Sequence, residues 1–217
     1  MNGVAQATGV HHPIFARIYR RVSAAGEAKG AAAHRDELLA GLSGRVIEVG
    51  AGHGLNFGHY PTTVEEVVAV EPEPSLRAAA GEAAARASVP IRVVDGVADA
   101  LPCEDEEFDA GVASLVLCSV PDQGRALQEL FRVLKPGAEL RFYEHVVAAK
   151  PRAARIQRML DRTVWPLLAG GCHAARDTIA AIEGVGFVVE RSRRFLFRPA
   201  LVAAPTAPHV LGVARRP

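Results

Sequence analysis

The feature that most limits how this chain can fold is an apolar run ending in closely spaced glycines, Val46-Ile47-Glu48-Val49-Gly50-Ala51-Gly52-His53-Gly54. Its β-branched residues predict a short buried strand. The glycines let the backbone turn sharply and approach a ligand that a side chain would push away. A helix start expected near Leu55 would turn its free N–H groups toward the same place. The pattern therefore indicates the wall of a nucleotide-like binding site.

Strands and helices alternate along the chain after this turn. Further strands are expected over residues 67–70, 91–94, 108–114 and 139–147, with helices over 74–88 and 123–134. The alternation predicts the α/β class, with a single doubly wound, mostly parallel, Rossmann-like sheet of seven strands. The two last strands, near 187–197 and 208–214, are joined by a short connection. They predict an antiparallel C-terminal hairpin at one edge of the sheet.

The length of 217 residues suits one domain with a substantial core. We expect residues 45–217 to form that unit, with a variable segment over 148–176 lining a substrate pocket. Residues 1–44 are expected to form an N-terminal helical lid, because the apolar residues between Ile14 and Val22 follow a helical spacing. A packing helix and a weak contact with a membrane surface are the alternatives for this segment.

Composition argues against several classes of protein. The net charge of +1 gives no basic field for a nucleic-acid partner. The sequence has neither an apolar run of membrane-spanning length nor the shape of a signal peptide, so a cytoplasmic protein without an integral membrane segment is expected. Cys103, Cys118 and Cys172 are odd in number, far apart and outside any Cys-x-x-Cys pair. This disfavours a disulfide framework and a zinc site, and no metal is expected. The oligomeric state stays open.

Ligands of an open α/β sheet bind outside the carboxyl ends of its strands. Glu71 ends the strand after the glycine turn, where a carboxylate can hold two ribose hydroxyls. Gly96-Val97-Ala98 ends the next strand and offers backbone N–H groups to an adenine edge, and Ser114-Leu115 ends the one after. One end of the sheet thus combines a glycine turn, a carboxylate and exposed backbone.

The glycine spacing separates two ligand classes. A dinucleotide needs Gly-x-Gly-x-x-Gly, whereas this chain has Gly-x-Gly-x-Gly followed by Leu55. Glu48 would repel a pyrophosphate but attract a positive ammonium group. A nucleoside with a cationic amino-acid tail fits better, and S-adenosylmethionine is such a ligand.

The stretch 46–54 resembles motif I of the class I S-adenosylmethionine-dependent methyltransferases. Glu71, the segments 98–102 and 108–109, and Leu130-x-x-Val133-Leu134-Lys135-Pro136-Gly137 match the order and spacing of the superfamily's later motifs. The resemblance implies S-adenosyl-L-methionine as cofactor and S-adenosyl-L-homocysteine as product.

A narrower resemblance links the chain to the alkyl thiol methyltransferases (the methyltransferase-like seven family). It rests on Asn56-Phe57 with Tyr60-Pro61, on 115–120, on Glu144-His145-Val146, and on Gly171-Cys172 with Arg176. It implies small hydrophobic thiols and hydrogen sulfide as acceptors. Animal members carry an apolar N-terminal membrane anchor that this sequence does not show, so membrane residence is not carried over. Val97 stands where the superfamily often has Asp, which leaves the adenine to backbone groups.

The leading expectation is a methyltransferase acting on a small molecule, with S-methylation of a hydrophobic thiol or sulfide favoured. An O- or C-methyltransferase of a quinone-like, phenol-like or natural-product substrate is the alternative, and a non-catalytic cofactor-binding module is a distant one. His145 is the expected catalytic residue, as a general base or substrate orienter, with a structural histidine as the alternative. The expected cofactor-binding residues are Tyr19, Glu48, Gly50, Ala51, Gly52, Asn56, Glu71, Pro72, Gly96, Val97, Ala98, Ser114 and Leu115.

Overall fold

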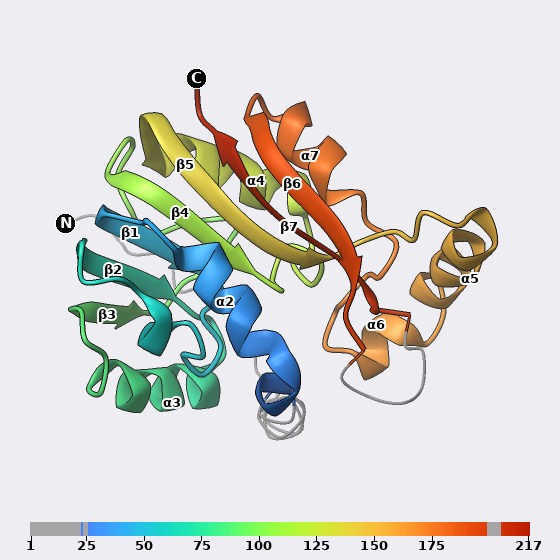
Figure 1. The fold of residues 1–217 in the computed structure, drawn as a ribbon, viewed down its shortest axis with the longest axis horizontal. Coiled ribbons are helices and arrows are strands. Elements are labelled where there is room, and N and C mark those ends of the chain that lie inside the picture. Colours follow the sequence, from blue (N-terminus) through green and yellow to red (C-terminus); the bar gives the residue numbers. More distant parts are fainter. Residues whose placement is uncertain (1–22, 24–25, 199–204) are drawn as a thin grey trace, which may run out of the picture.

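A computed structural model describes residues 23, 26–198 and 205–217 of the chain. Seven strands form one sheet in the order β3-β2-β1-β4-β5-β7-β6 (Figure 1). Their bounds are β1 Gly44–Val49, β2 Val64–Val70, β3 Ile91–Val94, β4 Phe108–Ser114, β5 Leu134–His145, β6 Val188–Leu196 and β7 Pro208–Arg215. The first five strands pair in parallel, and β7 runs antiparallel to both of its neighbours. The predicted α/β class, mostly parallel sheet and C-terminal hairpin are confirmed, with β7 as the inner strand of the hairpin.

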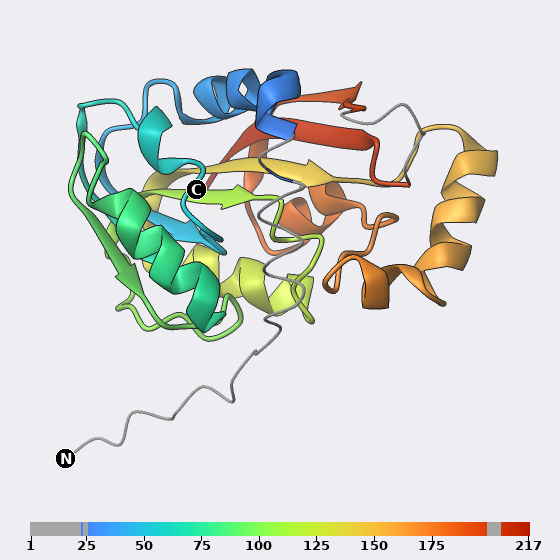
Figure 2. The same cartoon turned by 90° about the horizontal axis from the view of Figure 1, so that it is seen from below.

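Both faces of the sheet are covered, as a central parallel sheet requires. The helices and helical turns are η1 Glu27–Ala31, α2 Ala32–Leu39, η2 Phe57–His59, α3 Pro74–Ala84, α4 Gln123–Val133, α5 Pro151–Asp161, α6 Trp165–Leu168 and α7 Thr178–Gly184. One core cluster joins Ile47 and Val49 to α4 and α7, whereas Val46 on the other face packs in a second cluster with α2. Figure 2 shows the sheet between α2 on one side and α4 on the other.

Local sequence explains where the helices begin. Pro74 is the first residue of α3, and the carboxylate of Glu73 before it accepts a hydrogen bond from the Leu76 backbone N–H at 2.8 Å. Asp122 caps α4 in the same way through the Arg125 backbone N–H at 3.0 Å. These caps hold the helices against the carboxyl ends of β2 and β4.

The segment after β5 extends beyond the carboxyl end of the sheet as α5 and α6 (Figure 1). The buried side chain of Gln157 in α5 ties it back to the domain: its Oε1 accepts from the Ala148 N–H, and its Nε2 donates to the carbonyls of Ala174 and Pro205. This segment contains the region 148–176 that we predicted to line a substrate pocket.

The predicted lid falls partly outside the described residues, and Tyr19 is among those left out. In the part that is described, α2 packs its buried Leu38 and Leu39 onto the sheet as a core helix. Among the described residues, no helix combines the length and the apolar composition needed to cross a membrane.

Candidate functional site

The glycine turn after β1 is held next to the end of β2. Gly50, Gly52 and Gly54 have φ values of 65°, 59° and 84°, in the left-handed region that favours glycine. The Gly52 N–H donates to Glu71 Oε2 at 2.8 Å, and the Glu73 N–H donates to Glu71 Oε1 at 2.9 Å. Burial raises the pKa of Glu71 despite these two bonds. The structure thus brings the predicted glycines and the predicted carboxylate together.

Glu48 lies buried beneath this turn in a polar network. Its carboxylate accepts hydrogen bonds from Asn56 Nδ2 at 2.8 Å and from the Tyr60 hydroxyl at 2.7 Å. Burial raises the pKa of Glu48 to about 7, because the two donors only partly replace the lost hydration. Arg35 of α2 extends the network by donating to Asn56 Oδ1 at 2.6 Å and to Ser114 Oγ at 3.3 Å.

These groups surround a small pocket at the carboxyl ends of β1 and β4. Its lining comprises Arg35, Glu48, Gly50, Ala51, His53, Leu55, Asn56 and Ser114. Five of the predicted cofactor-binding residues therefore share one pocket. Arg35 and Tyr60 were not predicted as site residues, because nothing local in the sequence marks their polar ends as facing inward.

The remaining predicted residues lie along the same end of the sheet. Gly96 is buried, and a Cβ there would lie 2.9 Å from Pro102 Cδ, so the backbone needs glycine to pass. Val97 and Ala98 follow it and are partly exposed. Pro72, also partly exposed, adjoins Glu71. Leu115 has a φ of 57°, and its N–H bonds the Tyr143 carbonyl at 2.7 Å.

The turn after β4 is clamped from both sides by side chains that the sequence did not mark as site residues. The buried carboxylate of Glu144 accepts from the N–H groups of Val116, Leu117 and Cys118 at 2.9–3.1 Å. The guanidinium of Arg176 donates to the carbonyls of Leu117 and Val120 at 2.6 and 2.7 Å. We call residues 115–120 the clamped turn. Its backbone is fixed by charge-assisted hydrogen bonds, the stronger kind in proteins.

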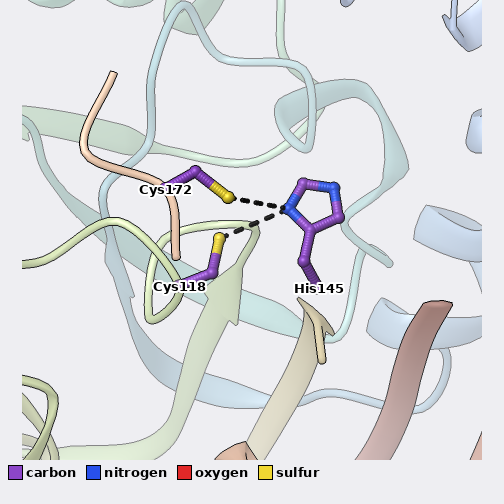
Figure 3. A group of neighbouring side chains, drawn as sticks. All are labelled: Cys118, His145 and Cys172. Atoms are coloured by element: carbon purple, nitrogen blue, oxygen red, sulfur yellow. Dashed lines mark hydrogen bonds between the residues drawn. The ribbon is translucent and has the colours of Figure 1, made fainter. Parts of the chain in front are cut away.

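His145, the expected catalytic residue, lies at the end of β5 beside two cysteines. Its Nδ1 is 3.4 Å from Cys118 Sγ and 3.5 Å from Cys172 Sγ, and Figure 3 shows both sulfurs facing this nitrogen. A hydrogen bond between the two thiols lowers the pKa of Cys172 and raises that of Cys118. We call these residues the Cys–His–Cys cluster. Two cysteines that are 54 positions apart in the sequence thus meet at the carboxyl end of the sheet.

Comparisons with known proteins agree with this architecture. Residues 47–142 match the family described as "Methyltransferase domain". Thiol S-methyltransferase TMT1B of Rattus norvegicus is 34% identical over 182 residues, which cover 81% of this chain and 73% of the relative. Thiol S-methyltransferase TMT1A of Homo sapiens is 33% identical over 154 residues, covering 69% and 63%. A solved SAM-dependent methyltransferase of Thermotoga maritima superposes with a TM-score of 0.68 at 20% identity, over 94% of this chain and 99% of that one. That last likeness concerns the fold alone.

Proposed function

The chain belongs to the S-adenosylmethionine-dependent methyltransferases, and from this premise we propose that it transfers a methyl group from S-adenosylmethionine to a small hydrophobic thiol or sulfide. The observation that carries the cofactor assignment is the Glu71 carboxylate bonded to Gly52 inside the glycine turn. What supports the thiol acceptor is the 34% identity to a thiol S-methyltransferase over 81% of the chain.

The residues present fit this cofactor. Each Glu71 oxygen accepts one backbone N–H and keeps a second lone pair, which suits two ribose hydroxyls. The Glu48 carboxyl group lies at the pocket floor, where an ammonium group would favour its ionised form, while Asn56 and Ser114 offer polar atoms beside it. Gly96, Val97 and Ala98 give backbone groups where an adenine edge would lie. Pro72 and Leu115 offer apolar contacts beside these polar groups, and Tyr19 is proposed as a contact from the N-terminal segment.

The bound cofactor supplies a methyl group made electrophilic by its sulfonium. The protein has to align an acceptor with that methyl and exclude water. His145 is the proposed catalytic group, orienting the acceptor or removing its proton at the end of β5. A thiol needs less help than a hydroxyl group, because thiols are more acidic, with a pKa of about 8.5 for a cysteine side chain, and the positive charge of the cofactor favours the thiolate. A phenol or quinone-derived enol relies more on a base, so O- or C-methylation is the second candidate function.

Ligand-dependent thermal stability tests the cofactor. S-Adenosylmethionine and S-adenosylhomocysteine should each raise the melting temperature, because a ligand that binds only the folded state stabilises it. NAD should not, and stabilisation by NAD alone would reject the assignment. Glu71→Ala should weaken binding of S-adenosylhomocysteine at least about a hundredfold, since two hydrogen bonds to a carboxylate are lost.

The control variant is Glu66→Ala. Glu66 lies in β2, the strand that Glu71 follows, but away from the site, where it pairs with Arg45 at 2.8 Å, and its loss should leave the ligand affinity unchanged. Because Glu71 also bonds Gly52, Glu71→Gln keeps one acceptor oxygen and serves as the milder variant. Unchanged affinity in both Glu71 variants would show that this carboxylate does not hold the ribose.

An acceptor panel tests the substrate class. Release of S-adenosylhomocysteine is measured with small alkyl thiols, hydrogen sulfide, phenols, quinols and amines at equal concentrations. Turnover of thiols in preference to the others is expected. Turnover of a phenol or quinol with none of any thiol would replace the thiol assignment by the O- or C-methyltransferase alternative.

A further inference from the structure

The Cys–His–Cys cluster has the dimensions of a metal site. In a tetrahedral zinc site, Zn–S bonds near 2.3 Å and Zn–N bonds near 2.05 Å place sulfur and nitrogen ligands about 3.6 Å apart. The two Nδ1–Sγ separations of 3.4 and 3.5 Å match this edge length. The three ligand atoms all lie within 4.8 Å of one another, so one ion can reach all of them.

Hydrogen bonds among the three side chains do not satisfy all of their donor and acceptor atoms. Nδ1 of a neutral histidine has one lone pair or one proton, so it makes one good bond where two sulfurs face it. Cys118 and Cys172 are both buried. In the described part of the chain, besides His145 and each other, the sulfurs have only the neighbouring Ser119 and Trp165 as hydrogen-bond partners. A thiophilic cation would use a lone pair of all three atoms at once.

The backbone around the cluster is fixed before any ligand arrives. Cys118 belongs to the clamped turn, whose amides are held by Glu144 and whose carbonyls are held by Arg176. The Cys172 segment is bonded to that turn through the His173 N–H and the Cys118 carbonyl at 2.7 Å. Gly171 has a φ of 86°, and a Cβ there would lie 2.9 Å from the Ser119 carbonyl oxygen. The two cysteine-bearing loops are therefore docked closely together.

We propose that Cys118, His145 and Cys172 bind a thiophilic divalent cation, with Zn²⁺ as the probe, and that its open fourth position takes the sulfur of the methyl acceptor. The second half of this proposal rests on the proposed function. Three protein ligands with one open position are typical of catalytic rather than structural zinc sites. Among the described residues, no fourth Cys, His, Asp or Glu joins the cluster. The cluster also lies at the carboxyl end of the sheet, as the pocket at Ser114 does.

The step balances without any further reactant. A thiol that coordinates the cation gives up its proton to solvent, because the metal stabilises the thiolate; His145 then orients the acceptor as a ligand of the cation and does not act as a base. The acceptor sulfur forms a bond to the methyl carbon, and the electron pair of the methyl–sulfonium bond leaves with the donor sulfur as a neutral thioether. The methylated acceptor is then a weak ligand and dissociates from the cation.

Metal binding is tested on the full chain without any methyl transfer. Protein with a histidine-free affinity tag is prepared with a phosphine reductant, stripped with a chelator and titrated with Zn²⁺ against a chromogenic competitor. One ion per chain with a nanomolar dissociation constant is expected. Cys118→Ser, Cys172→Ser and His145→Ala should each weaken binding at least a hundredfold. Cys103→Ser is the control and should bind as the wild type does, because Cys103 lies outside the cluster.

Cobalt reports the ligands directly. Co²⁺ should produce intense visible bands of a tetrahedral site and a near-ultraviolet thiolate band, and both should be lost in the Cys118→Ser and Cys172→Ser variants. Propanethiol should change the visible bands, whereas propanol should not. A dissociation constant weaker than about 10 μM would overturn the site.

Two outcomes separate this proposal from the proposed function. If stripped and zinc-loaded protein methylate thiols equally fast, the cation has no part in the reaction and the acceptor half is wrong, while thiol methylation stands. If zinc binds and propanethiol leaves the cobalt bands unchanged, the open position does not take the acceptor. A zinc-dependent rate for thiols together with a thiol-sensitive cobalt spectrum supports both halves.

Discussion

Gly50 is where the glycine turn and the clamped turn touch. A Cβ at this position would lie 2.2 Å from Val116 Cγ2, and the φ of 65° already disfavours any residue with a Cβ. Gly50→Ala should lower the free energy of unfolding by about 2–5 kcal/mol, since left-handed backbone costs about 1–2 and overpacking about 1–3. Chemical denaturation measures the change.

The matched control for Gly50 is Gly58. It is exposed in η2, and a Cβ there would meet no atom within 4 Å. Gly58→Ala should change stability by less than about 0.5 kcal/mol. Adding Val116→Ala to Gly50→Ala should remove the clash and restore the stability that the clash costs, but it should leave the backbone strain at residue 50. Full recovery would show that the positive φ at Gly50 costs nothing.

Among the structural elements, the clamped turn depends on one buried carboxylate, that of Glu144, to hold its backbone. Glu144→Gln replaces an oxygen that accepts a backbone N–H with an amide that donates, so one N–H of the turn loses its partner. We expect a loss of about 3 kcal/mol in stability and faster hydrogen exchange at the amides of residues 116–118. Thiol methylation should slow as well, because Cys118 and the neighbouring backbone lose their fixed positions.

Glu139 is the control on the same strand. Its carboxylate is partly exposed and pairs with the buried Arg141 and with the more exposed Arg215, and glutamine keeps an oxygen that can accept from Arg141. Glu139→Gln should therefore cost less than about 1 kcal/mol and leave exchange in the clamped turn as it is. Equal exchange at residues 116–118 in both variants would mean that Glu144 does not hold the turn.

For the molecule as a whole, the features that could be predicted from the sequence are those that arise from residues close together in the chain. A strand followed by glycines is a local signal, and the predicted positions of Gly50, Glu48 and Glu71 follow from it. The contacts of Arg35 and Arg176 are different, because their partners lie 21 and 59 residues away. Only the order of strands in the sheet brings such pairs together, and spacing along the chain does not encode that order.

The cysteines show most clearly that spacing along the chain does not reveal which residues the sheet brings together. The absence of a Cys-x-x-Cys pair argued against grouping them, since local spacing is the usual sign of a metal site. Cys118 follows β4 and Cys172 lies well beyond β5, yet parallel pairing of β4 and β5 puts the first beside His145 at the strand ends. A ligand set assembled by parallel strands and a later loop leaves no regular spacing in the sequence.

Two buried groups on different strands make the stability of the whole domain depend on pH in opposite directions. Glu48 in β1 has its pKa raised from 4.5 to about 7, so the folded state keeps a proton that the unfolded chain releases, and stability falls as pH rises through this window. Burial lowers the pKa of His209 in β7 from 6.5 to about 3, so stability falls as pH drops through that window. Between pH 4.5 and 6.5 the two slopes nearly cancel, so stability changes little with pH there.

Replacing one of the two residues should reveal the pH dependence of stability that the other one causes. The stability of the wild type relative to Glu48→Gln should fall by about 3 kcal/mol from pH 4.5 to 7, while that relative to His209→Asn should rise by about 4 kcal/mol from pH 3 to 6.5. Every other titrating group is common to the proteins compared, so urea unfolding across this range reports each residue together with the charges it interacts with, which are His145 and His34 for His209 and Arg35 and Glu71 for Glu48. The double variant should show the sum of both changes, because neither group contributes to the pKa shift of the other. A difference curve that is flat with pH for either variant would mean that its residue titrates alike in the folded and unfolded chain, and that the burial argument fails for that residue.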